Sequence, residues 1–209
     1  MALDELAEIA FENAEAYFDT MLNSELAKNI PLVGTAVALI RSAKDYRNRV
    51  FARNLAQFVR DVESVPAPFK EKLRAKLAAD QKDARRLADT LMVVVERCAD
   101  EEKAHFLSAV FISYIDGAID STMFRRLCMA IDAAFIDDLR WLVTAQIDKH
   151  QLRHAEARAL SHAGFTMIVP GTTYVREDLL PYMVTHVGRQ LRDAYVQGRA
   201  QVRRSAVAG

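Results

Sequence analysis

Glycine, proline and cysteine are scarce in this sequence, with seven, five and two residues among 209. So few helix breakers, with 51% hydrophobic and 27% charged residues, exclude a collagen-like or disordered chain and indicate a helix-rich globular one. Two cysteines, Cys98 and Cys128, make neither a disulfide framework nor a CxxC zinc motif. Both lie among apolar residues at helical spacing, so we expect reduced thiols in the core of a cytoplasmic protein.

The sequence also lacks an apolar run of the roughly 20 residues that a membrane-spanning helix needs. The segment Ile30–Ile40, IPLVGTAVALI, has eleven residues without a charge. Its first interpretation is a buried core helix, in which Gly34 allows another backbone to approach closely. The alternative is a membrane-inserting or oligomerising segment built from residues 1–40. The candidate membrane or oligomer contacts are Ile30, Leu32, Val33, Gly34, Val37, Leu39 and Ile40.

Charge is distributed unevenly although 28 basic and 28 acidic residues balance. Residues 1–29 form an acidic amphipathic helix, with apolar residues at three-to-four spacing from Leu3 to Leu22. This acidic start does not fit a secretory signal. Residues 41–60 carry six Lys or Arg residues, typical of a solvated face that pairs with acids, although such cations also meet phospholipid or nucleic acid.

Several further helices with short connections are predicted over residues 64–145. Ser64–Pro68 is a break, Asp80 is an expected N-cap, and either Asp120 or Ser121 caps a helix that continues to about residue 145. Asp132 is expected to accept hydrogen bonds from an adjacent helix. The predicted core contains Phe111, Ile115, Leu127, Ile131, Phe135 and Leu139.

The pattern changes in the last quarter of the chain. Two β-like runs, Phe165–Val169 and Tyr182–Thr185, flank a Pro-Gly turn and lie between a helix over Gln151–His162 and a final helix over His186–Gln197. This order is typical of a small winged module. In DNA-binding winged helices, the helix before the hairpin enters the major groove and the wing contacts phosphate. The candidate nucleic-acid or partner contacts are Gln151, Arg153, His154, Arg158 and Arg176.

Motifs for catalysis or metal binding are absent. The sequence has no HExxH, CxxC, GxSxG or phosphate-binding glycine loop. His150 and His154 would share a helix face, but zinc would need two further ligands nearby. We therefore expect no catalytic residue, no metal site, no cofactor and no enzymatic activity.

Two passages of the sequence resemble a known family. One is AHFLSAVFISYIDG followed by FRRLCMAIDAAFIDDLRWL, where Asp132 and Leu139 occupy matching places. The other runs from Leu160 through Gly164 and Thr185 to GRQL. Together they are similar to the abortive-infection alpha proteins of bacteria over roughly residues 88–194. The resemblance implies a role in phage defence and brings no catalytic residues.

The sequence thus predicts a mostly α fold: a multi-helix bundle over residues 1–145, with the apolar and then basic helix at 30–62, and a winged-helix-like α/β module with a basic tail over 146–209. The predicted function is a non-enzymatic interaction or effector protein, in bacterial defence, acting through self-association or partner docking. A homo-oligomer is expected. One alternative is a DNA-binding regulator using the winged module, and another is a membrane-perturbing effector using residues 1–40.

Overall fold

The computed structural model describes residues 46–145, 155–172 and 180–208 of the chain. The predicted N-terminal helix and the Ile30–Ile40 segment lie outside these residues. Within them the protein is mostly helical with one small sheet, which confirms the predicted helical bundle. The elements are α4 (Tyr46–Glu63), α5 (Ala67–Ala79), α6 (Gln81–Arg97), α7 (Glu101–Ile115), α8 (Ser121–Ala133), α9 (Ile136–Thr144), α10 (Ala155–His162), β1 (Thr166–Ile168), β2 (Tyr182–Val184) and α11 (His186–Ala208).

Local signals set most helix boundaries. Asp80 accepts hydrogen bonds from two backbone N–H groups in the first turn of α6, and Asp120 accepts one from Met123 at the start of α8. The hydroxyl of Thr185 accepts a hydrogen bond from the backbone N–H of Gly188 in α11. These side chains satisfy N–H groups that have no partner inside the helix, so the predicted caps at Asp80 and Asp120 are confirmed, and Thr185 is a third cap.

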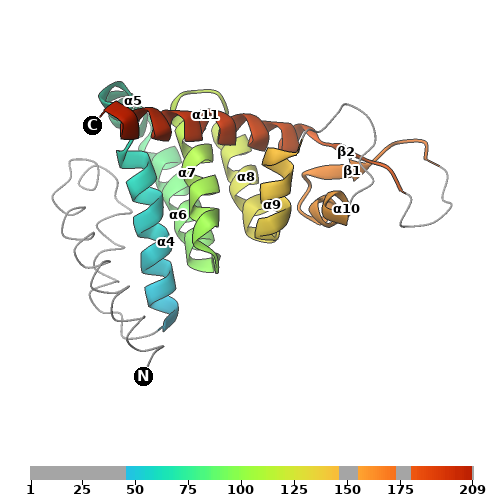
Figure 1. Ribbon diagram of the computed structural model, residues 1–209. Coiled ribbons are helices and arrows are strands. Elements are labelled where there is room, and N and C mark those ends of the chain that lie inside the picture. The colour runs from blue at the N-terminus through green and yellow to red at the C-terminus, as the bar shows by residue number, and fades with distance from the viewer. Residues whose placement is uncertain (1–45, 146–154, 173–179, 209) are drawn as a thin grey trace.

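Helix α7 lies at the centre of the bundle, and its residues from Phe106 to Ile115 are all buried. Helices α4 and α8 pack along it, whereas α11 crosses it (Figure 1). Two small residues allow this crossing, because a Cβ at Gly198 would lie only 2.6 Å from the Cα of Ala109. Next to this contact Phe106 stacks on Tyr195 with ring centroids 4.5 Å apart. The close approach therefore places α11 firmly on the bundle.

The C-terminal ends of α6, α7, α8 and α9 share one feature: a side chain from another helix donates to their last carbonyls. The donor–acceptor pairs are Asn54 with Cys98, Lys76 with Tyr114, Lys103 with Asp132, and Arg192 with both Leu142 and Ala145. Such carbonyls lack a partner within their own helix, and cations there also interact favourably with the helix dipole. The C-terminal ends of these four helices are thus joined to neighbouring helices.

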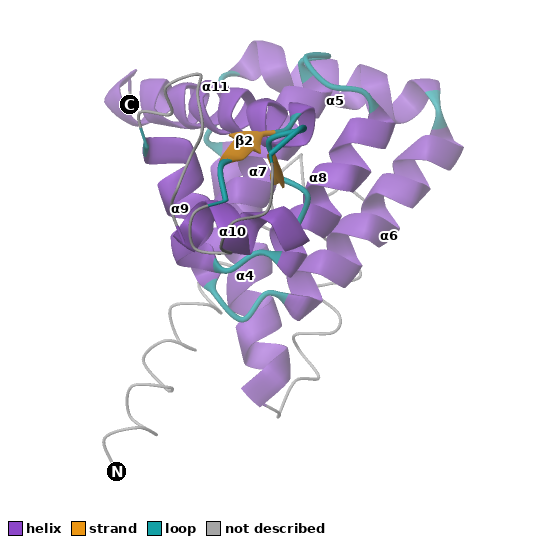
Figure 2. Cartoon of the chain, turned by 90° about the vertical axis from the view of Figure 1, so that its right-hand side faces the viewer, coloured by secondary structure: helices purple, strands orange, loops and turns teal. Residues whose placement is uncertain are grey.

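The predicted β runs form an antiparallel pair, as expected, in which Met167 lies opposite Met183. The connection starts with a tight turn: the N–H of Thr172 donates to Val169, and Gly171 has a positive φ of 81°. This conformation favours glycine. Figure 1 shows the sheet and α10 at one end of the bundle, and this end faces the viewer in Figure 2.

Two helix boundaries differ from the prediction. The helix expected to run from residue 121 to about 145 is broken, because Ala134 and Phe135 adopt extended backbone angles between α8 and α9. The helical phase is lost at this point, so Phe135 is 65% exposed and its predicted place in the core is wrong. The other five predicted core residues are buried. The final helix is longer than expected, since α11 continues to Ala208.

The predicted domain boundary at residue 145 stays a prediction. Helix α11 follows the hairpin directly in sequence, yet it packs on α7, α8 and α9 of the bundle. In the part of the chain that the structure describes, no helix has the length and apolar character needed to cross a membrane.

Candidate functional site

Of the five predicted nucleic-acid or partner contacts, the structure describes Arg158, which is exposed on α10. The other four, Gln151, Arg153, His154 and Arg176, lie outside the described residues. The seven candidate membrane or oligomer contacts within residues 30–40 also lie outside them. The structure therefore does not bring the predicted site together.

Carboxylates lie close to α10. Burial raises the pKa of Asp138 on α9, and the negative charges of Glu156 and Asp137 raise it further. Glu156 belongs to the first turn of α10. The beginning of α10 thus brings together three acids: Glu156 itself and Asp137 and Asp138 of α9. Phosphate groups of a nucleic acid would be repelled by this cluster.

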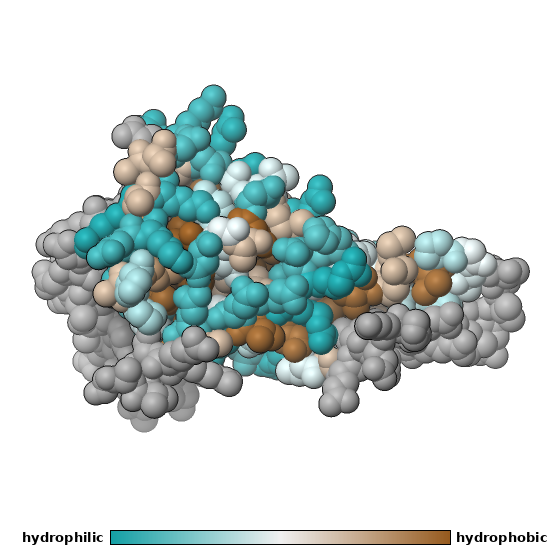
Figure 3. All heavy atoms as spheres, turned by 90° about the horizontal axis from the view of Figure 1, so that it is seen from above, coloured by the Kyte–Doolittle hydropathy of each residue, from teal (hydrophilic) through white to brown (hydrophobic). Residues whose placement is uncertain are grey.

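The outer face of the β1–β2 hairpin exposes two large apolar side chains. Met167 and Met183 are cross-strand partners that are 43% and 37% exposed. The opposite face holds Thr166, Tyr182 and Val184, which are buried against the rest of the molecule, and Ile168 at the end of β1, which is 38% exposed. From above, mostly hydrophilic residues cover the bundle, and tan and brown residues are exposed at the hairpin end (Figure 3).

A second unusual feature is a group of polar side chains inside the bundle, which we call the Asp61 centre: Gln57, Asp61, His105, Ser108 and Arg199. Asp61 on α4 is buried, and its carboxylate is held from three helices. Gln57 donates to its Oδ1 at 2.9 Å, and Ser108 donates to its Oδ2 at 2.7 Å. Nδ1 of His105 lies 2.6 Å from the same Oδ2, and Arg199 NH1 lies 3.7 Å from it.

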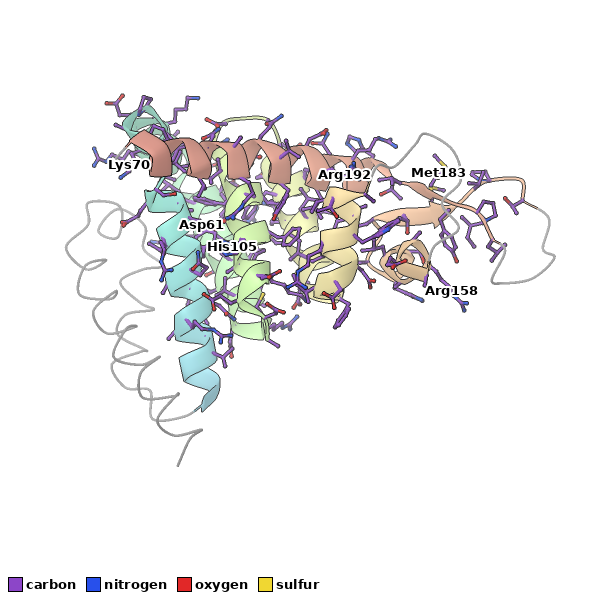
Figure 4. All side chains as sticks on the ribbon, in the orientation of Figure 1. Asp61, Lys70, His105, Arg158, Met183 and Arg192 are labelled. Atoms are coloured by element: carbon purple, nitrogen blue, oxygen red, sulfur yellow. The ribbon has the colours of Figure 1, made fainter. Side chains whose placement is uncertain are left out.

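The hydrogen bonds of the Asp61 centre determine which ring nitrogen of His105 carries the proton. Three groups lie near Nδ1 of His105: Asp61 Oδ2 at 2.6 Å, Arg199 NH1 at 3.2 Å and the Gln57 amide nitrogen at 3.4 Å. The carboxylate oxygen is the nearest of the three and is an acceptor, so we assign the proton to Nδ1, which donates to Asp61. Ser108 also points to Asp61 rather than to Nε2 of the histidine, and it is buried. The three residues therefore do not form a serine-nucleophile triad, although each residue type is present. Figure 4 shows Asp61 and His105 next to each other in the bundle.

Sequence reasoning missed the Asp61 centre. A signal was present: Asn54, Gln57 and Asp61 follow each other at i, i+3 and i+7 on one face of α4, among residues that are otherwise apolar. On α7, His105 and Ser108 are likewise three positions apart and share one face. Neither pattern shows that the two faces meet, because that depends on how α4 and α7 pack.

The remaining chemistry is sparse. Both thiols are free and buried, as expected, and burial raises the pKa of Cys98 to about 11. Asp132 accepts from Arg97 of α6, which confirms its expected contact with an adjacent helix. Within the described ranges, no cluster of three or more His, Cys, Asp or Glu residues could hold a metal ion.

No protein-family model, curated protein or solved structure matches this chain. The outer hairpin face and the Asp61 centre are the two unusual features of the described residues.

Proposed function

We propose that this protein acts without catalysis, as an interaction protein that binds a second copy of itself through the outer face of the β1–β2 hairpin. The observation that carries this proposal is the exposed cross-strand pair of Met167 and Met183. Following the sequence resemblance, we place this self-association in bacterial phage defence.

The exposure of the two methionines follows from the register of the sheet. Because side chains alternate along a strand, a slip by one residue would bury them and expose Tyr182 and Thr166. The buried inner face opposes such a slip. Methionine is flexible and polarisable, which suits a surface that adapts to a partner. An isologous contact would bring the pair from each copy together, with the same patch on both sides.

Charge also favours a second copy over a nucleic acid. The chain has 28 basic and 28 acidic residues, and a net charge near zero promotes association. The first two turns of α11, directly after the hairpin, expose both Arg189 and Asp193. Two copies related by a two-fold axis can pair such unlike charges, whereas a DNA backbone needs an excess of cations.

The order α10, β1, β2 supports a winged-helix-like module, which is the basis of the DNA-binding alternative. Thr166 of β1 donates to Ala157 of α10, so α10 covers the inner face of the hairpin. Arg158 and Met183 therefore lie on opposite sides of this module (Figure 4). Docking through the methionines and DNA binding through α10 would thus use different surfaces and can be tested separately.

Sedimentation velocity of the full chain over a range of concentrations tests the proposal. We expect a dimer whose dissociation constant rises at least tenfold when Met167 and Met183 are both replaced by lysine. Met129→Lys on α8 is the matched control, because Met129 is even more exposed, at 49%. It should leave the dimer unchanged.

A wild-type monomer at all concentrations would refute the proposal, as would equal loss of the dimer in the control. Fluorescence anisotropy with duplex DNA tests the alternative. Salt-dependent binding that Arg158→Gln weakens, with the methionine variant unaffected, would favour a DNA-binding regulator.

A further inference from the structure

The two ring nitrogens of His105 have different surroundings. Nδ1 faces Asp61, Gln57 and Arg199 inside the bundle. Nε2 has no hydrogen-bond partner among the described residues, and 27% of the side chain is exposed. The exposed part of the ring is therefore the part directed away from Asp61. In the tautomer that donates to Asp61, Nε2 on the other side of the ring carries no proton.

Asp61 strengthens this nitrogen as a nucleophile. A carboxylate that accepts the Nδ1 proton fixes the tautomer and the ring orientation and increases the electron density on Nε2. Asp61 cannot rotate away easily, because Gln57 holds one of its oxygens and Ser108 the other. It is also only 5% exposed, so water does not compete for it.

We propose that Nε2 of His105 is a site of phosphorylation. The donor is a phosphoryl compound with a good leaving group, such as a phosphoramidate or an acyl phosphate. The Nε2 lone pair attacks phosphorus, the bond from phosphorus to the donor's nitrogen or oxygen breaks, and the leaving group departs with that bond's electron pair. The ring then carries a positive charge on its Nδ1–H side, which the Asp61 carboxylate stabilises and whose proton it can accept.

Arg199 favours a phosphoryl group over a neutral acyl group. Its NH1 lies 3.2 Å from Nδ1 of His105 and its side chain is 26% exposed, so the guanidinium lies beside the ring on a partly exposed side chain. Nδ1 already donates to Asp61 and so does not accept a hydrogen bond from Arg199, whose NH1 instead pairs with Asp61 at 3.7 Å. A planar guanidinium matches the geometry of phosphate oxygens and neutralises their charge.

The test is to incubate the full chain with potassium phosphoramidate at neutral pH. The products are followed by intact mass and by alkaline peptide mapping, because phosphohistidine is acid-labile. The four other histidines, His150, His154, His162 and His186, are internal controls. We expect His105 to be modified at least about tenfold faster than His162 and His186, although both of those are more exposed. We expect the phosphorus on Nε2.

Equal or slower modification of His105 would overturn the proposal, as would attachment at Nδ1. Asp61→Asn should slow the reaction by about tenfold or more, since it removes the charge that activates the ring. An unchanged rate in a folded Asp61→Asn protein would also refute the mechanism.

A measurement on the wild-type protein covers the case in which Asp61→Asn does not fold. Long-range ¹H–¹⁵N correlation spectra distinguish the two tautomers of His105. We expect a protonated Nδ1 and an unprotonated Nε2 at alkaline pH. A proton on Nε2 instead would show that the nucleophilic nitrogen is absent and would contradict the proposal.

Discussion

Around Asp61, charged and polar side chains lie inside the bundle, whereas at the β1–β2 hairpin the side chains of Met167 and Met183 lie on the surface. In the Asp61 centre every oxygen of the carboxylate has a partner, from α4, α7 or α11. At the outer hairpin face the methionines remain 43% and 37% exposed. A buried charge is tolerated only when it is fully paired, while an exposed apolar pair costs little until a partner covers it.

The difference indicates which region maintains the fold and which is free to bind. Removing one member of the Asp61 centre leaves the others desolvated and unpaired, so stability should be sensitive there. Changing the outer hairpin face removes no intramolecular contact of comparable strength. Substitutions in the two regions should therefore separate folding from binding.

The largest effect is expected for Asp61→Ala. Gln57, Ser108 and His105 would lose their common acceptor, and removing one partner from a buried pair costs about 3–5 kcal/mol of unfolding free energy. Urea denaturation followed by circular dichroism measures this loss. Asp89→Ala, at an exposed position of α6, is the control and should change stability by less than about 0.5 kcal/mol. Similar small losses in both variants would mean that the Asp61 centre does not stabilise the bundle.

A smaller loss is expected for Gly198→Leu. A side chain there would meet the backbone of Ala109, so α11 would have to move away from α7. We expect a loss of about 1–3 kcal/mol from overpacking, although glycine is intrinsically the poorer helix former by about 1 kcal/mol. Thermal unfolding measures it. The neighbouring Gln197 is exposed, so Gln197→Leu should leave the melting temperature unchanged or raise it. A stable Gly198→Leu protein would show that α11 is not held closely.

The interior of the bundle should also be sensitive to alkaline pH through Cys98 and Tyr114, whereas the exposed pair of the outer hairpin face, Met167 and Met183, does not ionise. Burial raises the pKa of Cys98 from 9.0 to about 11, and burial with a hydrogen bond to Asp83 raises that of Tyr114 from 10.0 to about 12. Both groups ionise more readily in the unfolded chain than in the folded one. Their contribution to the free energy of unfolding is therefore fully present below pH 9 and is lost between pH 9 and 12.

Urea midpoints measured from pH 8 upwards with a reducing agent present check this pH dependence. They should fall as the pH rises, and less steeply in Tyr114→Phe. Midpoints that stay constant from pH 8 to 11 would contradict the burial of these groups.

The smallest effect is expected for the double change of Met167 and Met183 to serine. Both side chains are partly exposed, and surface substitutions usually alter stability by no more than about 0.5 kcal/mol. Chemical denaturation at low protein concentration, where self-association does not contribute, measures it. A loss above about 2 kcal/mol would show that the methionines are part of the fold and would remove the contrast between the two regions.

Helix starts were predictable because their signals are local. Asp80 and Thr185 cap their helices through backbone groups two or three residues away, and the sequence shows both partners. The break between α8 and α9 was not predictable in this way. Neither Ala134 nor Phe135 is a helix breaker, and the apolar spacing continues across them. Helix α8 packs on α6 and α7, whereas α9 packs on α10 and α11, so tertiary packing rather than propensity accounts for the break.

The sequence by itself determined the helical class, the capped boundaries, the antiparallel hairpin and the buried thiols, because spacing and turn chemistry act over a few residues. Only the tertiary structure decided that Asp61 is inside. Its partner His105 is 44 positions away, and Arg199 comes from the last helix. A polar residue on a helix is ordinarily solvated, and it becomes a buried acceptor only when helices distant in sequence pack around it with matching donors.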